Sequence, residues 1–334
     1  MSVLVTGAAG FIGMHVAAAL LARGEDVVGV DNINEYYDVR LKHARLAELE
    51  RHPAFAFHAL DLGDHARFLA TLRAEHGGAI DRVVHLAAQP GVRYSLENPF
   101  AYVQANVVGH LAILEFCRHQ ADFKHLVYAS SSSVYGANTA LPFAVADRTD
   151  TPLSLYAATK KADELMGHCY AHLFGIPQTG LRFFTVYGPW GRPDMALWIF
   201  CAKILAGEPI PVFNNGQMKR DFTYVDDVVA GVLAALDRPP APVVGPGGAP
   251  LPPQRIYNIG NHRSEPLMEL IGVIEAALGR KAIVDFRPMQ PGDVVETFAD
   301  VAAAQRDLGF RASTCVDVGV PLFVDWYLGW RARA

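Results

Sequence analysis

The feature that most constrains the fold is a glycine motif near the N-terminus, in the stretch VLVTGAAGFIG. Gly7, Gly10 and Gly13 stand between an apolar run typical of a strand and a pattern typical of a helix. Such glycines allow a tight turn, a close approach of the backbone to a pyrophosphate, and close packing of the helix on its sheet. The helix N-terminus then stabilises the phosphate charge. The motif predicts a dinucleotide site in a parallel α/β fold; the alternative is a glycine-rich turn without a ligand.

Short apolar runs alternate with helical patterns over the first half of the chain. The runs predict buried strands at residues 2–7, 26–31, 55–62, 81–88, 124–131 and 177–184. The helical patterns between them include residues 12–23, 63–76, 100–119 and 155–174. Because strands and helices that alternate in this way form doubly wound sheets, we predict a Rossmann-like α/β fold with a parallel sheet. Its ligand site should lie at the carboxyl ends of the strands.

The pattern loosens after about residue 183, which predicts a second, smaller domain. We expect residues 1–182 to form a dinucleotide-binding domain, to which segments near 221–238 and 255–260 return. Residues 183–334 should form most of a discontinuous C-terminal domain that caps the sheet and binds the substrate. The Pro- and Gly-rich segment 238–253 is typical of a mobile surface loop.

Composition and charge exclude several classes of protein. Hydrophobic residues make up 51% of the 334 residues and charged residues 19%, as in ordinary globular proteins. The net charge of −5, without a lysine or arginine block, argues against a nucleic-acid partner. The four cysteines lie far apart without metal-ligand spacing, so we expect no metal site and reduced thiols in a cytoplasmic protein. We see no signal peptide and no run of about 18 apolar residues, so we expect no membrane contact.

Further candidate residues follow the ends of the predicted strands. Asp31 ends the second strand, where a carboxylate accepts from an adenosine ribose and repels a 2′-phosphate, so NAD is favoured over NADP. Asp61 ends the third strand and HLAAQPG (85–91) the fourth, although each could equally be an ordinary strand end. The candidate cofactor-binding residues in these segments are Gly7, Gly10, Phe11, Ile12, Gly13, Asp31, Asn32, Asp61, Leu62, Leu86, Ala87, Ala88 and Gln89.

A serine run and a Tyr-x-x-x-Lys pair carry the predicted chemistry. Residues 130–133 are four serines at the end of the fifth strand, either facing the cofactor crevice or forming a solvated turn. Tyr156 opens the 155–174 helix, and Lys160 lies one turn later on the same face. A neighbouring ammonium and a cationic nicotinamide both favour the phenolate. A phenolate base beside a serine hydroxyl and NAD predicts the oxidation of a secondary alcohol.

Together, the glycine motif, Ser-Ser-Ser-x-Val-Tyr-Gly and Tyr-x-x-x-Lys resemble the extended short-chain dehydrogenase/reductase family of nucleotide-sugar enzymes. The segments PGVRYSLENPFAYVQAN, 182–196 and 289–294 are most similar to the UDP-glucuronate 4-epimerases. The resemblance implies that Ser131 is the catalytic hydroxyl, Tyr156 the base and Lys160 its helper. It also implies cofactor-side roles for Asn106, Tyr156 and Lys160. A homodimer built from helices 100–119 and 155–174 is implied in the same way.

The residues after the catalytic hydroxyl bear on the reaction. Ser132 and Ser133 stand where the resembling 4,6-dehydratases have an Asp-Glu pair, and Ser133 stands where decarboxylases have a glutamate. The absence of an acid at either place argues against both reactions. The resemblance then implies an isomerase: a hydride leaves C4 of the sugar, the 4-keto intermediate rotates, and the hydride returns to the other face.

The sugar is predicted from the groups that would hold it. A C4 ketone beside a C6 carboxylate is prone to lose CO₂, so an epimerase for glucuronate should grip that carboxylate with neutral hydroxyls. Thr185 stands where UDP-galactose 4-epimerases have asparagine, and Gln290 where they have arginine. We therefore expect UDP-glucuronate and UDP-galacturonate, with a UDP-glucose or UDP-N-acetylglucosamine 4-epimerase, or a UDP-glucuronate decarboxylase, as alternatives.

The diphosphate of such a substrate calls for basic residues. The resemblance matches Arg220 to a phosphate-binding arginine, whereas any arginine taken singly could equally be a surface charge. The candidate substrate-binding residues are Arg93, Ser131, Ser132, Ser133, Thr185, Arg192, Arg220 and Asp293.

Overall fold

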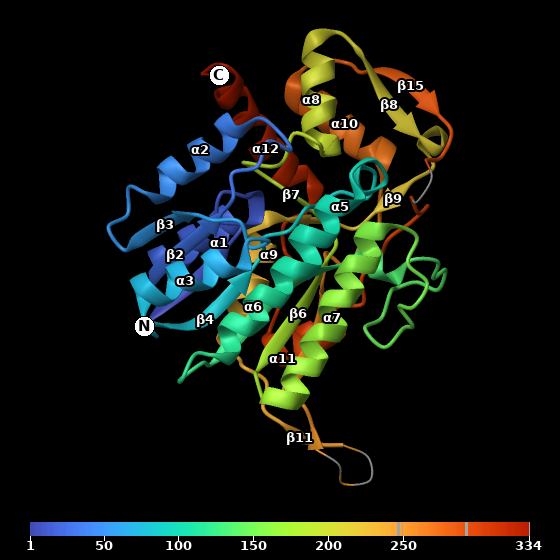
Figure 1. Ribbon diagram of the computed structural model, residues 1–334. Coiled ribbons are helices and arrows are strands. Elements are labelled where there is room, and N and C mark those ends of the chain that lie inside the picture. Colours follow the sequence, from blue (N-terminus) through green and yellow to red (C-terminus); the bar gives the residue numbers. More distant parts are fainter. Residues whose placement is uncertain (246–247, 249, 291–292, 334) are drawn as a thin grey trace.

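The computed structural model describes residues 1–245, 248, 250–290 and 293–333. A large parallel sheet is covered by helices on both faces, with smaller elements beside one end of it (Figure 1). The strands are β1 (Ser2–Thr6), β2 (Asp26–Asp31), β3 (Phe55–Ala59), β4 (Ile80–His85), β5 (His125–Ser131), β6 (Gln178–Phe183), β7 (Thr185–Tyr187), β8 (Pro209–Phe213), β9 (Lys219–Arg220), β10 (Phe222–Tyr224), β11 (Val243–Val244), β12 (Pro250–Leu251), β13 (Gln254–Ile259), β14 (Glu265–Pro266) and β15 (Ile283–Arg287).

The helices connect these strands and include short 3-10 and π-helical turns. They are α1 (Phe11–Ala22), α2 (Val39–Leu49), α3 (His65–His76), α4 (Tyr94–Glu97), α5 (Pro99–Tyr102), the π-helical turn η1 (Val103–Val108), α6 (Gly109–Arg118), the 3-10 turn η2 (Ser132–Tyr135), α7 (Leu155–Phe174), α8 (Ala196–Ala206), the 3-10 turn η3 (Asn214–Gly216), α9 (Val225–Leu236), α10 (Leu267–Leu278), α11 (Ala302–Leu308) and α12 (Val316–Arg331).

The main sheet confirms the predicted doubly wound fold. Its seven strands are all parallel and run in the order β13-β6-β5-β4-β1-β2-β3. Strand β6 is buried along its whole length and β1 along nearly all of it, because helices cover both faces. The strand order reverses between β1 and β4, which makes the crevice there the expected place for a ligand.

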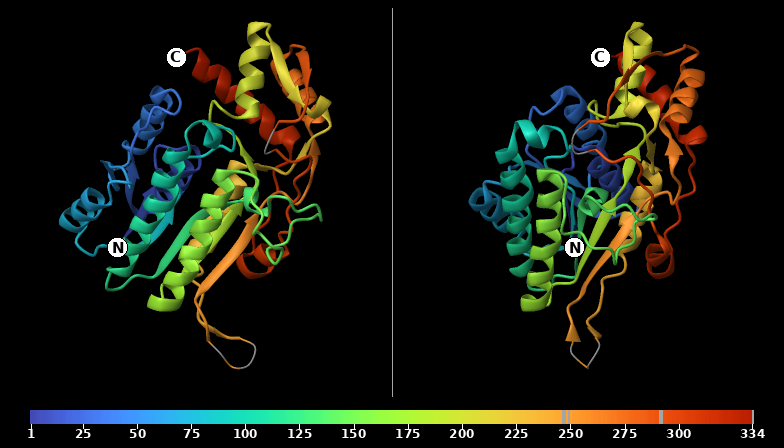
Figure 2. Two further views of the ribbon diagram at one scale, coloured as in Figure 1. Left: turned by 45° about the vertical axis from the view of Figure 1, so that its right-hand side comes forward. Right: turned by 90° about the vertical axis from the view of Figure 1, so that its right-hand side faces the viewer.

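Helices lie on both faces of the sheet (Figure 2), and a hydrophobic cluster fills the space on each face. Helices α1 and α9 pack against each other on one face, and α3, α6 and α7 cover the other. Helix α7 begins where the Ser154 side chain accepts a hydrogen bond from the Ala157 amide, and it ends at Gly175 in a left-handed conformation. These local signals fix the position of Tyr156 in the first turn of the helix.

Several elements after β6, namely β7 to β10, β14, β15, α8, α10 and α12, lie beside the carboxyl ends of the strands (Figure 1). Strands β8 and β15 pair in parallel, β7 pairs with β10, and β9 pairs with β14. Helix α10 packs against both α8 and α12. The chain returns to the main sheet in α9, which packs on α1, and in β13, which pairs with β6.

The segment 238–253 differs from the loop that its composition predicts. Val243 and Val244 pair with Leu251 and Pro250 in a short antiparallel ribbon, which projects from the bottom of the molecule in Figure 1. Residues 246, 247 and 249 of this segment lie outside the described residues. Valine favours extended backbone, and the Pro250 ring does not prevent pairing at the edge of so short a ribbon.

One helical run, predicted at residues 100–119, is long and apolar enough to cross a membrane by length and composition alone. Residues Pro99–Arg118, which span α5, η1 and α6, have a mean hydropathy of 1.3 and the length of a membrane span. Half of the run is buried inside the protein, against the sheet and α7. The run is not an uninterrupted apolar stretch, since polar residues such as Gln104, Asn106 and Glu115 lie within it, so it does not contradict the expectation of no such stretch. Its buried half covers the sheet.

Candidate active site

A cavity of about 370 Å³ opens at the carboxyl ends of the central strands. Its lining comes from the glycine loop, from the ends of β2, β4, β5 and β6, and from the start of α7. The sequence-predicted residues that it brings together are Gly7, Gly10, Phe11, Ile12, Gly13, Asp31, Asn32, Asp61, Leu62, Leu86, Ala87, Ala88, Ser131, Ser132, Ser133, Tyr156, Lys160, Thr185 and Arg192.

The glycine loop leaves no room for side chains. Gly7 has a φ of 71°, a left-handed conformation, and a Cβ there would lie 2.8 Å from the backbone nitrogen of Ala87. A Cβ on Gly13 would lie 2.0 Å from the carbonyl oxygen of Gly7. The loop therefore packs backbone against backbone, and it presents the start of α1 to the cavity as a cradle suited to a pyrophosphate.

Asp31, at the end of β2, is hydrogen-bonded to the glycine loop. Its carboxylate accepts hydrogen bonds from the amide of Ala9 at 3.2 Å and from the amide of Ile33 at 2.9 Å. The buried Lys42 ammonium lies 3.9 Å away. Because Asp31 lines the cavity and ends β2, it lies where a carboxylate meets the ribose hydroxyls of a dinucleotide.

Ser131, Tyr156 and Lys160 all line the cavity. The Ser131 hydroxyl donates a hydrogen bond to the Ser133 hydroxyl at 3.1 Å and accepts one from the Ser133 amide. The Lys160 ammonium donates to the carbonyl oxygen of Ala129 at 2.9 Å. Hydroxyls and an ammonium that meet in one crevice form a set able to move protons.

Lys160 also has a buried anionic partner that sequence reasoning missed. Its ammonium lies 3.1 Å from the Asp163 carboxylate, and both side chains are almost completely buried. Burial raises the pKa of Asp163 to about 7, although the Lys160 ammonium opposes this shift. The i to i+3 spacing in KKAD was a signal for the pair, but only the packing shows that it faces inward.

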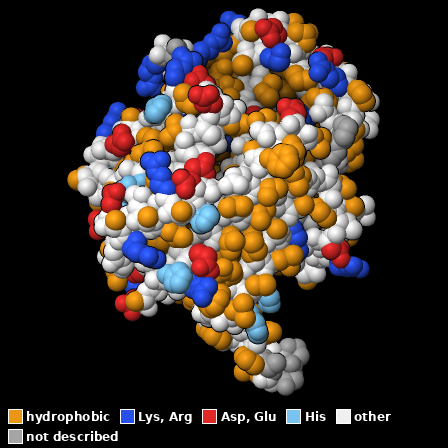
Figure 3. All heavy atoms as spheres, in the orientation of Figure 1, with side chains coloured by type: hydrophobic (Ala, Val, Ile, Leu, Met, Phe, Trp, Pro, Cys, Tyr) orange, Lys and Arg blue, Asp and Glu red, His pale blue; other side chains and the backbone are white. Residues whose placement is uncertain are grey.

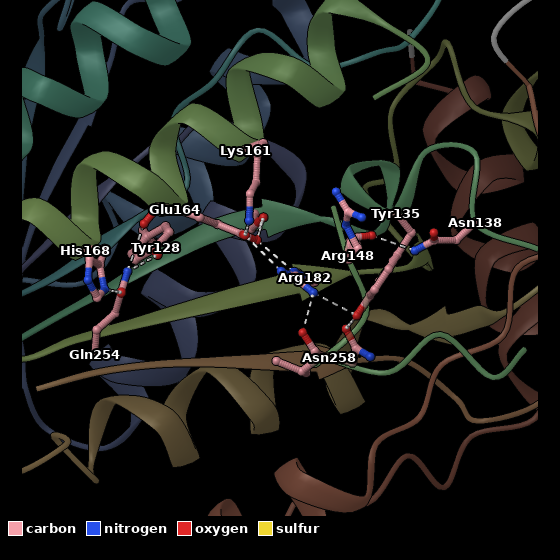
Figure 4. Close-up of polar contacts among 12 residues, drawn as sticks. Tyr128, Tyr135, Asn138, Arg148, Lys161, Glu164, His168, Arg182, Gln254 and Asn258 are labelled. Carbon is pink, nitrogen blue, oxygen red and sulfur yellow. Dashed lines mark hydrogen bonds and ion pairs between the residues drawn. The ribbon is translucent and has the colours of Figure 1, made fainter. Parts of the chain in front are cut away.

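A second buried network joins Glu164, Arg182 and Tyr135 (Figure 4). Glu164 on α7 accepts from Arg182 Nε at 2.8 Å and Nη2 at 2.9 Å, and from the Ser130 hydroxyl at 2.7 Å. Arg182 Nη1 also donates to the Tyr135 hydroxyl at 3.0 Å. The pair ties α7 to β6 and to the end of β5, and so holds the two elements that carry the predicted catalytic groups.

Asn106 and Gln89 do not line the cavity but support it. The Asn106 side chain accepts from the amide of Gln89 at 2.7 Å and donates to its carbonyl oxygen and to the Thr159 hydroxyl. These bonds link the loop after β4 to α7. Asn106 lies in the π-helical turn η1, and its hydrogen bonds direct its side chain at that loop, so that it does not line the cavity.

The other predicted substrate residues form a separate cluster that does not line this cavity. Arg220 Nη2 donates to Asp293 at 2.9 Å, and Arg93 lies 3.6 Å from the same carboxylate and stacks on the Phe213 ring. Two guanidinium groups that share one carboxylate leave a net positive charge. Residues 291 and 292 of the 289–294 motif lie outside the described residues.

Several cavity residues were missed from the sequence. Asn34, Tyr36, Tyr37 and Lys42 line the cavity and come from the segment that follows β2. Their signal was the polar and aromatic run NINEYYDVRLK directly after Asp31. Apolar residues such as Phe183 and Met195 were missed because nothing in their type distinguishes them from core residues.

Comparisons with known proteins agree with this geometry. Residues 3–260 match the model of the NAD dependent epimerase/dehydratase family. A probable UDP-glucuronate 4-epimerase of Rhizobium meliloti is 48% identical over 334 residues, which are 98% of this chain and 97% of the relative.

Solved structures are similar over nearly the whole chain. The crystal structure of UDP-glucuronic acid 4-epimerase from Bacillus cereus, in complex with UDP-glucuronic acid and NAD, has a TM-score of 0.87 and 33% identity, and the match covers 99% of this chain and 100% of that one. A UDP-glucose 4-epimerase of Thermotoga maritima, in a structure with UDP-glucose, has a TM-score of 0.86 and 27% identity over 99% and 100% of the two chains. The chain belongs to the NAD dependent epimerase/dehydratase family.

Proposed function

We propose that the protein is an isomerase that interconverts UDP-glucuronate and UDP-galacturonate with NAD as its cofactor. The observation that carries this proposal is that Tyr156, Lys160 and the serine run face one cavity together with the glycine loop. The similarity to UDP-glucuronate 4-epimerases of known sequence and structure supports the same substrate.

The residues around the cavity fit NAD. The glycine loop would hold the pyrophosphate, because the closely packed loop and the start of α1 line the cavity. Asp31 would accept from the adenosine ribose, and Lys160 would hold the nicotinamide ribose. When bound, NAD supplies the acceptor and donor of the hydride at C4 of the sugar.

The chain's own groups would handle the proton of the C4 hydroxyl. The Tyr156 phenolate takes this proton as the hydroxyl becomes a ketone, and it returns the proton when the alcohol forms again. Ser131 holds the same oxygen and relays the proton. Lys160 stabilises the phenolate, and Asp163 keeps the ammonium in place through the buried ion pair.

The absence of acids next to Ser131 suits a sugar that must keep its carboxylate. Ser132 and Ser133 line the cavity where a carboxylic side chain would assist elimination or decarboxylation. Hydroxyl groups of these serines and of Thr185 would hold the C6 carboxylate so that the C5–C6 bond does not align with the π system of the C4 carbonyl. The 4-keto intermediate would then keep its CO₂. Arg93 and Arg220 would bind the diphosphate, because the Asp293 carboxylate that they share neutralises only one of their two positive charges.

We also propose the division of the chain into two domains. Residues 1–182, together with segments near 221–238 and 255–260, would form the NAD-binding domain, and the rest of residues 183–334 the substrate-binding domain. The packing of α9 on α1 and the pairing of β13 with β6 support the two returning segments.

A homodimer in the cytoplasm is the assembly that we propose. The outer faces of α5, η1, α6 and α7 expose a row of large apolar side chains, and Figure 3 shows hydrophobic residues gathered there. This helix-pair face comprises Phe100, Val103, Leu111, Leu165, Leu173 and Phe174. A second copy would cover it with the same two helices, giving a four-helix bundle. The four cysteines are free, which fits a reducing compartment.

Proton NMR of the purified protein with UDP-glucuronate, without added reductant, tests the proposal. We expect an anomeric signal of UDP-galacturonate that grows to a stable mixture, with little change in a parallel UDP-glucose sample. A UDP-pentose product would contradict the proposed grip on the carboxylate. Turnover in the UDP-glucose sample alone would contradict the substrate but leave the fold and Tyr156 in place.

A further inference from the structure

Arg45 is a buried cation that the proposed chemistry does not use. Its side chain lies on α2 with no exposed surface, and none of the ion pairs among the described residues involves it. Burial lowers the pKa of the guanidinium, since the charged form loses its hydration. The Asp31 carboxylate favours the charged guanidinium from beyond ion-pair distance. Burying a cation without an ion pair costs several kcal/mol, so its presence calls for a reason.

The guanidinium bridges two segments that are far apart in the sequence. Nη1 donates to the carbonyl oxygen of Ala9 in the glycine loop at 2.9 Å and to the Tyr37 hydroxyl at 2.6 Å. Nη2 donates to the carbonyl oxygen of Trp190 at 2.5 Å. Trp190 lies in the turn formed by residues 188–194. Because the planar fork of an arginine presents donors on both sides, a lysine cannot make the same bridge.

The 188–194 turn carries Arg192 into the cavity. The turn is held in an unfavourable backbone conformation, since Trp190 has a φ of 63°. A bulky residue in this region costs about 1–3 kcal/mol and persists only where its surroundings hold it. Besides Arg45, His15 on α1 bonds the carbonyl oxygen of Pro189 at 3.0 Å. Both bonds come from helices that flank the glycine loop.

The other side of the turn packs on the C-terminal helix. The Trp190 ring lies 5.3 Å from the Trp326 ring and 6.0 Å from the Trp330 ring, both on α12. Trp198 contacts Trp326 as well, so all four tryptophans of the chain form one cluster. A shift of the 188–194 turn would therefore change the environment of every tryptophan.

We propose that Arg45 is a positioning residue that couples the dinucleotide site to the substrate side of the cavity. A pyrophosphate held by the glycine loop brings negative charge toward a guanidinium that has no carboxylate of the described residues within ion-pair distance. The same guanidinium fixes the 188–194 turn through Trp190, and with it Arg192 and the substrate side of the cavity. Occupation of the dinucleotide site then favours binding of UDP. This inference rests on the proposed function, because it takes NAD and UDP as the two ligands.

The test is the effect of NAD on the affinity for UDP, measured by isothermal titration with and without saturating NAD. In the unmodified protein we expect NAD to tighten UDP binding at least about fivefold. Arg45→Met should bring this ratio close to one, and Arg45→Lys should give an intermediate ratio. Arg51→Met is the matched control, since Arg51 follows α2 and its side chain is 72% exposed. It should keep the full ratio.

A structural role alone would lower the melting temperature of the variants but leave the ratio unchanged. The coupling is overturned if the unmodified protein shows a ratio near one, or if a folded Arg45 variant keeps the unmodified ratio. If Arg45→Met does not fold, the ratio of UDP affinities with and without NAD is measured for Arg45→Lys alone, and that ratio tests the coupling. Tryptophan fluorescence gives a second readout: NAD should shift the emission of the unmodified protein, and it should shift that of Arg45→Lys by less. Failure of the unmodified protein to bind UDP with NAD present contradicts the proposed function instead.

Discussion

Tyr156 lines the same cavity as the glycine loop, the serines 130–133 and Lys160, which forms a buried ion pair with Asp163. Its neighbour Lys160 is held by the Ala129 carbonyl and by Asp163, so the ammonium is fixed before any ligand arrives. A fixed group catalyses better than a mobile one, because no reorganisation is needed during the reaction. The chemistry of this site therefore depends on a few side chains whose positions are set by others.

Tyr156→Phe removes the proposed base and leaves the ring in place. We expect the turnover number for UDP-glucuronate to fall about 10²–10⁴-fold, the usual contribution of a general base. Binding of NAD and of UDP should change little, since the ring keeps its edge contact with Tyr102. NMR assays and titrations with both ligands check this. A variant with turnover within a factor of two of the unmodified protein would show that another group takes the proton.

Asp31→Asn tests the choice of cofactor. The substitution removes the negative charge that repels a 2′-phosphate and weakens the bonds to a ribose hydroxyl. We expect the affinity for NAD to fall about tenfold and the preference for NAD over NADP to shrink. Competitive titrations of NAD and NADP measure both effects. Asp26→Asn, at the exposed start of the same strand, is the control and should change neither.

At the scale of the elements, helix α7 has two roles, one on each of two faces. Its first two turns present Tyr156 and Lys160 to the cavity, and Glu164, one turn after Lys160, anchors the helix to the sheet. The Glu164–Arg182 pair is buried on both sides and bidentate, so its geometry is specific. Loss of this anchor should loosen both the helix and the serine run, because Ser130 bonds the same carboxylate.

Glu164→Gln should destabilise the fold in a pH-dependent way. Burial alone would raise the pKa of Glu164, but the hydrogen bonds and charge of Arg182 outweigh it and lower the pKa below 4.5. A lowered pKa means stability that is present above pH 4.5 and is lost as the pH falls further. We expect the variant to lose about 3 kcal/mol at pH 7, and the difference from the unmodified protein to shrink below pH 4.5.

Urea unfolding at a series of pH values measures this difference. Glu269→Gln on the exposed side of α10 serves as the control, and it should cost little at any pH. A destabilisation of Glu164→Gln that stays constant from pH 7 to below pH 4.5 would mean that the ionised carboxylate does not stabilise the fold.

At the scale of the whole molecule, the sheet, the C-terminal elements and the helix-pair face form three regions with different tasks. The sheet presents the cofactor cradle, and the C-terminal elements supply the 188–194 turn and the Arg220 cluster. The helix-pair face lies across α5, η1, α6 and α7, along the same helices that hold Asn106 and Tyr156. Assembly through this face would therefore brace the elements of the site from outside.

Leu165→Arg together with Leu173→Arg should prevent dimer formation. Leu165 is 56% exposed and Leu173 66%, so the folded monomer can accept both charges. In a dimer the arginines would be buried against an apolar partner, at a cost of several kcal/mol. Sedimentation velocity should give a dimer for the unmodified protein and a monomer for the variant. Leu322→Arg on α12, at a site that is 46% exposed, should remain a dimer; a dimeric double variant would contradict the proposed interface.

Much of the fold and of the site could be read from local patterns. The strands, the glycine loop and the Tyr156 helix were predictable because each depends on residues that are neighbours in sequence: apolar runs, glycines at fixed spacing, and a serine cap. The cavity lining at the strand ends followed from the rule that parallel strands end at one edge. The apolar lining residues and the ribbon within 238–253 were not predictable, because their types fit other places equally well.

The sequence by itself determined the doubly wound sheet, the glycine cradle and the grouping of Ser131, Tyr156 and Lys160 at one crevice. These depend on short-range patterns and on the fixed handedness of parallel crossovers. Only the tertiary structure decided which charges are buried and with what: Asp163 beneath Lys160, Glu164 against Arg182, and Arg45 between Ala9 and Trp190. Burial and pairing of charges depend on contacts between distant segments, and no local pattern encodes those contacts.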